Sequence, residues 1–278
     1  MTRSSRSLPV LVLMLIAVLV LGACGGGSTP ASSSGSGATA APGATTAPAA
    51  TTAPAASDVP AASGAVNLGG AASSLDNLDN YSFKIVMASE GASEGMMGLV
   101  KAGGSITMEG TVVMKPAQAA DVTMTLSDGT TASKIGYRII GNTAYTSFGD
   151  TWMSTPASDA ENAIDAFKPD KMLSGYSSLA GLTKVGDEQK NGFATEHFSS
   201  TADPGAGASS IFGLPDATWK TDIWIAKDGG YVVSATMVAT GKTATGEAGS
   251  FTISVDVTAV NSPNVKIEAP ANVVELPS

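Results

Sequence analysis

The chain has 278 residues, a net charge of −9 at pH 7 and a charged content of only 14%. Surfaces that bind nucleic acid are basic, so this acidic balance argues against a nucleic-acid partner. A single cysteine excludes an intramolecular disulfide, and the 43% apolar content is sufficient for a core without one.

Residues 1–23 are typical of a secretory signal peptide. Arg3 and Arg6 precede an apolar run that begins at Leu11 and is shorter than the about 20 residues needed to span a bilayer. The sequence Leu21-Gly22-Ala23-Cys24 resembles the bacterial lipobox. This resemblance implies cleavage before Cys24 and attachment of acyl chains such as palmitate, which anchor the mature protein on the extracytoplasmic face of the cell membrane. The alternative is an ordinary signal peptide followed by a chance cysteine.

Residues 24–66 combine the lipidated cysteine with a linker rich in Ala, Pro, Ser, Thr and Gly. Asp58 is its single charged residue, and nothing aromatic occurs in it. Such a segment cannot bury enough surface to offset its ordering entropy, so the sequence predicts a disordered spacer. Threonine and serine beside proline also resemble O-glycosylated stalks.

Residues 67–278 are predicted to form one β-rich domain. Phe83, Ile85 and Met87 alternate with more polar residues, and this period of two recurs along most of the domain. Gly110 is predicted to mark a bulge or bend, and Asn191-Gly192 a hairpin turn. Helices are predicted over 159–167, where Ser158 is the N-cap and forms a capping box with Glu161, and over 171–179.

Four passages together resemble the LppX/LprG family of bacterial lipoproteins, whose fold is akin to that of the LolA/LolB lipoprotein carriers. They are residues 74–81, 141–152, 182–193 and 222–229. The resemblance implies an α+β fold that is mainly antiparallel β: a strongly curved, half-open β-barrel sheet with helices covering its concave face. It also implies an apolar cavity for acyl chains between the two.

Apolar and aromatic residues of the expected strand and helix faces are the candidate lining of this cavity. They are Met87, Met108, Met114, Met124, Ile139, Tyr145, Trp152, Phe167, Met172, Leu173, Leu179, Phe212 and Trp224. Flexible, polarizable methionines suit a surface that accepts variable apolar shapes. The alternative for each of them is ordinary core packing.

Catalytic and metal-binding patterns are weak. His197 is the single histidine, no Gly-x-Ser-x-Gly elbow occurs, and the Asp187-Glu188 pair flanks a turn. We therefore expect no enzyme activity, no cofactor and no metal site.

The sequence thus predicts a membrane-anchored extracytoplasmic lipoprotein that binds, and transports, lipids or lipidated molecules such as lipoglycans. The alternative is an envelope scaffold or sensor lipoprotein that binds a protein partner and has no lipid cavity.

Overall fold

The computed structural model describes residues 68–91, 100, 102–157, 160–165, 167–169, 173, 181–204 and 213–275. The chain separates into two compact units, 1–58 and 59–278, and every described residue belongs to the second. The signal peptide, Cys24, the linker and most of the expected helix over 171–179 lie outside the described residues. No helix among the described residues is long and apolar enough to cross a membrane.

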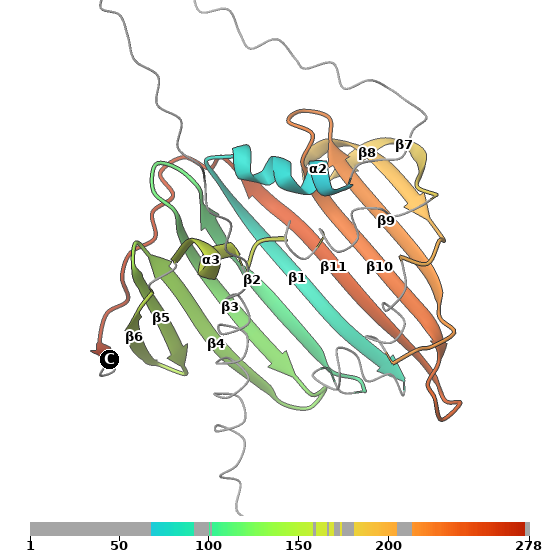
Figure 1. Cartoon of the computed structure of the whole chain (residues 1–278), viewed down its shortest axis with the longest axis horizontal. Helices are drawn as coiled ribbons and strands as arrows, with labels where there is room; N and C mark the ends of the chain where they lie inside the picture. Colours follow the sequence, from blue (N-terminus) through green and yellow to red (C-terminus); the bar gives the residue numbers. More distant parts are fainter. Residues whose placement is uncertain are drawn as a thin grey trace, which may run out of the picture. The chain divides into compact units, whose positions relative to one another are not determined.

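Twelve strands form one sheet (Figure 1). They are β1 (Asn80–Gly91), β2 (Ser105–Val113), β3 (Ala119–Ser127), β4 (Ala132–Ile140), β5 (Thr143–Phe148), β6 (Thr151–Pro156), β7 (Thr183–Lys190), β8 (Phe193–Ser200), β9 (Thr218–Ala226), β10 (Val232–Lys242), β11 (Ala248–Val260) and β12 (Val273–Glu275). The described helical segments are α2 (Leu68–Ser73), the short 3₁₀ helix η1 (Ser74–Asn77) and α3 (Ala160–Asp165).

The strand order is β12-β6-β5-β4-β3-β2-β1-β11-β10-β9-β8-β7. Two antiparallel meanders, β1–β6 and β7–β11, therefore lie side by side and join where β1 pairs with β11. The short β12 returns to pair with β6 in parallel. The sheet is not closed into a barrel, because β12 and β7 remain as its two edges.

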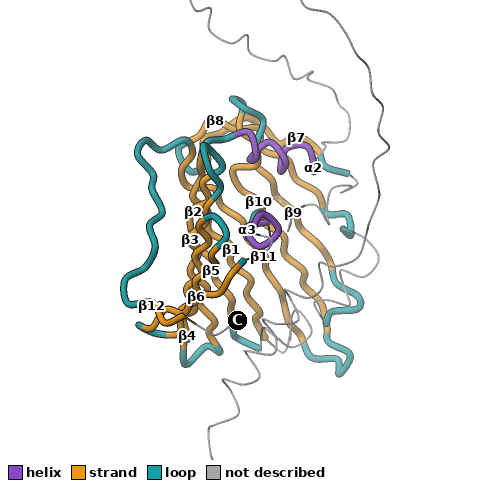
Figure 2. The backbone as a smooth tube through the Cα atoms, turned by 60° about the vertical axis from the view of Figure 1, so that its left-hand side comes forward, coloured by secondary structure: helices purple, strands orange, loops and turns teal. Residues whose placement is uncertain are grey.

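The predicted α+β fold, a half-open barrel with helices covering the concave face, is wrong for this structure. The described fold is nearly all β, and α2 and α3 have six residues each. Six residues extend about 9 Å along a helix axis, whereas twelve strands span about 50 Å. Figure 2 shows α2 and α3 as short segments beside a much wider sheet. The capping box at Ser158 and Glu161 correctly indicated a helix, but the helix is too short to cover the sheet.

One face of the sheet carries the core, and we call it the inner face. Ile85, at the middle of β1, is fully buried and lies opposite Met108 of β2 and Val255 of β11. Its neighbours in the chain, Lys84 and Val86, point to the opposite, outer face, where they are more exposed. Full burial of one such aliphatic side chain contributes about 1.5–3 kcal/mol. The alternating apolar residues that predicted the strands thus form one continuous core.

The bulge or bend expected at Gly110 is not found. Gly110 lies in regular register between Phe83 and Val122. A Cβ at this position would lie 2.2 Å from the backbone oxygen of Asp121. Glycine therefore permits close approach of β2 and β3. The expected Asn191-Gly192 hairpin turn is confirmed, with positive φ angles of 51° and 85°.

A buried lysine ties α3 to η1. The side chain of Lys168 is 4% exposed, and its Nζ lies 2.7 Å from Asp165 and 3.2 Å from Asp76. Burial alone would lower the pKa of Lys168. Its hydrogen bonds with the two carboxylates outweigh this effect, so the pKa lies above its usual value. The segment that follows α3 is therefore fastened to the N-terminal end of the described domain.

Candidate functional site

The inner face becomes more exposed toward β3–β6. Met124, Tyr137, Ala144 and Phe167 are half-buried against the core, and the side chain of Phe148 is 38% exposed. We call these five residues the apolar strip. Register places Met124, Tyr137, Ala144 and Phe148 on the inner face, because they align with Met108, Val122, Ile139 and Ile135.

The strip is organised around one aromatic pair. The rings of Tyr137 on β4 and Phe167 after α3 have centroids 5.2 Å apart, in a tilted arrangement. Burial raises the pKa of the Tyr137 hydroxyl, so the group is neutral at physiological pH. The strip therefore offers hydrocarbon and neutral aromatic surface, without a charge of its own.

Most of the predicted lining residues that the structure describes pack with this face. Met87, Met108, Ile139 and Leu173 are buried in the core, and Met114, Met124 and Phe167 pack against it half-buried. Met172, Leu179 and Phe212 lie outside the described residues, as does Cys24.

Three of the predicted aromatic residues, Tyr145, Trp152 and Trp224, lie on the outer face instead. Tyr145 pairs with Arg138, whose side chain lies over the Trp152 ring at 5.3 Å and contacts Asp121 at 2.5 Å. Arg138 also donates a hydrogen bond to the backbone oxygen of Glu268. Arg138 therefore holds the segment before β12 against the outer face, which Figure 2 shows on the side of the sheet away from α3.

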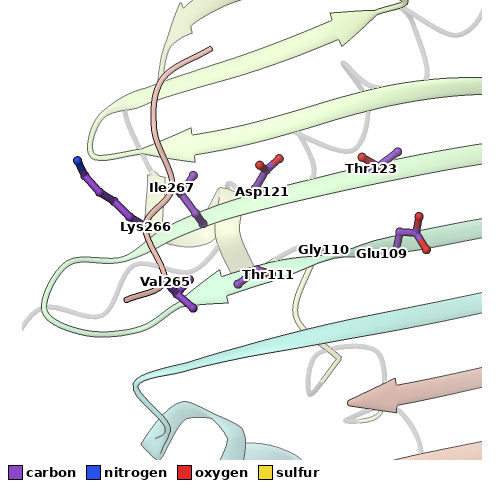
Figure 3. A pocket seen from close by; sticks show the side chains of 8 residues that line it. All are labelled: Glu109, Gly110, Thr111, Asp121, Thr123, Val265, Lys266 and Ile267. Atoms are coloured by element: carbon purple, nitrogen blue, oxygen red, sulfur yellow. The ribbon is translucent and has the colours of Figure 1, made fainter. Parts of the chain in front are cut away.

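A hollow of about 380 Å³ lies between this segment and strands β2 and β3 (Figure 3). Its lining is mostly polar: Glu109, Gly110, Thr111, Asp121, Thr123, Val265, Lys266 and Ile267. Its charges are satisfied within the protein, because Asp121 pairs with Arg138, Lys266 with Glu268 at 2.7 Å and Glu109 with Lys84 at 3.7 Å. This hollow is polar and on the outer face, so it is not the apolar acyl-chain cavity expected from the sequence.

A third cluster surrounds His197, also on the outer face. The imidazole stacks on Trp224 with centroids 4.4 Å apart and planes inclined by 14°. Its Nδ1 lies 3.0 Å from Glu188 and its Nε2 lies 3.1 Å from Asp222. The sequence pattern alone does not group His197 with Trp224, Glu188 and Asp222. The signal that unites them is cross-strand pairing, since His197 and Trp224 are partners in the β8–β9 register.

In the described part of the chain, no group of three or more His, Cys, Asp or Glu residues is arranged so that it could hold a metal ion. The carboxylates around His197 approach it from opposite sides of the ring. They therefore hydrogen-bond to it and do not converge on a common point.

No protein-family model and no curated protein matches the chain. Among solved structures, it is similar to LprF from Mycobacterium bovis, with 17% identity and a TM-score of 0.43 over 73% of this chain and 95% of that chain. LprF is a lipoprotein of the LppX/LprG family, so the resemblance expected from the sequence is confirmed.

Two weaker matches come from complexes of MucB with MucA. A chain of the Pseudomonas aeruginosa MucA/MucB complex matches with 13% identity and a TM-score of 0.31 over 73% of this chain and 60% of that chain. A chain of MucB in complex with MucA(peri) matches with 12% identity and a TM-score of 0.30, over 73% and 59% respectively.

Proposed function

We propose that this chain is a membrane-tethered, extracytoplasmic lipoprotein that holds the acyl part of a lipid or lipidated molecule against the inner face of its sheet. The observation that carries the proposal is the apolar strip, in which four half-buried residues lead from the core to Phe148, which is 38% exposed. An acyl chain laid on such a surface is removed from water, which is favourable by about 0.8 kcal/mol per buried methylene.

The N-terminal sequence supplies the tether. Two or more acyl chains on Cys24 are expected to hold the protein stably at the membrane, and the Ala/Pro-rich linker gives the domain reach above it. The domain itself does not need to bind the bilayer. Its acidic balance is consistent with this division of labour, because anionic lipid headgroups repel it.

The proposed function is binding without chemistry. Both ring nitrogens of His197 face carboxylates, so in this arrangement neither accepts a proton from a hydroxyl nucleophile. The strip offers Tyr137 as its one polar group, and that hydroxyl is neutral at physiological pH.

A scaffold or sensor that binds a protein partner is the second candidate. The observation that favours it is exposed apolar residues on both edge strands, Val185 on β7 and Val274 on β12, which are 60% and 53% exposed. Edge strands present unpaired backbone groups to which a partner strand can be added.

Native mass spectrometry of residues 25–278, mixed with membrane lipid extract and purified without detergent, tests the proposal. We expect a bound lipid mass, which Phe148→Asp reduces at least about tenfold by placing a charge on the apolar strip. Val185→Asp is the matched control, because it adds the same charge to an exposed apolar residue on the distant edge, and it should leave lipid binding unchanged. Protein that never retains lipid, or equal loss in both variants, would refute lipid binding at the strip.

A further inference from the structure

The edge strand β7 is held to the sheet by few buried groups. It pairs with β8, and most of its residues are exposed. Its register shifts between Lys184 and Gly186, where Val185 is 60% exposed. Side-chain contacts beyond the strand ladder therefore contribute a large share of what holds β7 in place.

The single histidine of the chain lies between β7 and β9. His197 of β8 faces Glu188 of β7 through Nδ1 and Asp222 of β9 through Nε2, at 3.0 and 3.1 Å. The His197 side chain is 16% exposed, and one ring face is covered by Trp224. Glu188 also accepts a hydrogen bond from Nε1 of Trp224.

Both contacts of His197 can be hydrogen bonds only when both ring nitrogens carry protons. Ionised carboxylates only accept hydrogen bonds, and a neutral imidazole has one N–H, so it can donate to Glu188 or to Asp222 but not to both. In the neutral ring, the other nitrogen presents a lone pair to a carboxylate oxygen at about 3 Å, which is repulsive. An imidazolium ion satisfies both carboxylates at once.

We propose that His197 is a proton-dependent clamp: the imidazolium joins β7 to β9 through Glu188 and Asp222. Loss of its proton breaks the contact with Glu188, which keeps its hydrogen bond from Trp224 Nε1, and so loosens β7. Glu188 is the partner that leaves, because its side chain is 47% exposed and can be hydrated, whereas that of Asp222 is 15% exposed. The clamp is therefore closed at lower pH and open at higher pH.

The surrounding charges are compatible with this assignment. Lys190 of β7 lies 4.2 Å from the centroid of the Trp224 ring, and Lys220 of β9 lies 3.0 Å from Asp222. Partial burial alone would raise the pKa of the Asp222 carboxyl. Hydrogen bonds from Lys220, Ser199 and His197 outweigh this effect, so the pKa lies below its usual value. Asp222 thus remains ionised while the imidazole gains or loses its proton.

A second set of contacts on β7 provides an internal control. Lys184 lies 2.8 Å from Asp187 and 2.5 Å from Glu196, and Lys227 lies 2.5 Å from Asp187. Register places Lys184 opposite Phe198 and Asp187 opposite Glu196, on the face away from His197. Lysine and carboxylate groups keep their charges between about pH 5.5 and pH 8. These ion pairs therefore hold β7 to the same extent at both pH values.

Hydrogen exchange of the mature chain at about pH 5.5 and about pH 8, on either side of the range in which imidazoles usually titrate, tests the proposal. After correction for the intrinsic exchange rate, protection of the β7 amides should fall about two- to fivefold at the higher pH, as expected for loss of one partly exposed charged contact. Amides of β2 and β3 serve as the reference for global stability and should show no such change.

Three variants separate the clamp from a general effect of pH. His197→Phe keeps a ring on Trp224 without N–H donors, and should give the low protection at both pH values. Glu188→Gln should also remove the pH dependence, because the amide carries no charge. Lys184→Met should lower protection of β7 at both pH values and preserve their ratio. A pH dependence that persists in His197→Phe, or that is absent from the unmodified protein, overturns the proposal.

Discussion

Replacing Ile85 and Val86 separately by alanine tests which face of the sheet carries the core. The two residues are adjacent in β1, but Ile85 is 0% exposed and lies between Met108 and Val255, whereas Val86 points to the outer face. A shift of one residue in register would exchange their faces and, with them, every inner-face assignment made above.

The expected cost follows from burial. Ile→Ala in a core costs about 2–5 kcal/mol, through lost transfer free energy and the cavity that remains. Ile85 is fully enclosed by strands on both sides, so we expect about 3–4 kcal/mol. For a domain of this size, this corresponds to a decrease in Tm of about 6–16 °C. Val86→Ala removes two partly exposed methyl groups and should cost less than about 1 kcal/mol.

Urea unfolding of residues 25–278, followed by tryptophan fluorescence, measures both variants. Similar m-values in both variants would show that the midpoints report stability of the native state. Equal destabilisation by the two substitutions, or a larger effect of Val86→Ala, would refute the assignment of the inner face.

Two further substitutions test contacts outside the core. Asp76→Asn removes the carboxylate that joins Lys168 to η1 but leaves the Lys168–Asp165 pair. Hydrogen-exchange protection of α3 should therefore fall about fivefold, which is about 1 kcal/mol, a modest effect because the Asp76 side chain is 40% exposed. Asp165→Asn keeps the link to η1 and is the control, and equal effects of the two substitutions would contradict the role of Asp76. In the β3–β4 turn, hydrogen bonds from the backbone N–H of Thr131 and from the hydroxyl and N–H of Thr130 hold the pKa of Asp128 well below its usual value. The stability that Asp128 contributes is therefore present above about pH 4 and is lost as the pH falls through the lower native pKa. Asp128→Ala should lower the urea midpoint at neutral pH and have less effect at about pH 2, and an effect of equal size at both pH values would contradict this.

Local pattern was sufficient to predict the strands and several of the turns. The alternation of Phe83, Ile85 and Met87 requires one buried face, and Asn191-Gly192 adopts the positive φ angles that a tight hairpin needs. These signals depend on residues a few positions apart. They do not depend on where the remainder of the chain lies.

The arrangement of helices and the faces of individual aromatic residues were not predictable in the same way. A capping box signals that a helix begins, but it does not say where the helix ends or what it packs against. In the structure α3 packs against β4, and Lys168 contacts a carboxylate 92 residues earlier. Tyr145 and Trp152 lie in short strands with weak alternation, so the sequence could not tell inner from outer. The strand pairing places Tyr145 opposite Arg138, whose guanidinium group lies over the Trp152 ring, and neither aromatic residue is in the core.

The pairing of β1 with β11 has a consequence for how the domain assembles. Tyr81 and Val260, which lie side by side at this joint, are far apart along the chain, whereas each meander on either side is made of neighbouring hairpins. Contacts between distant segments form late, because the intervening chain must be ordered first. During synthesis, which delivers the chain N-terminus first, β1 keeps one side unpaired until almost all of the chain has emerged. During that interval the exposed side of β1 is where a chaperone would protect the protein or where a second copy would trap it.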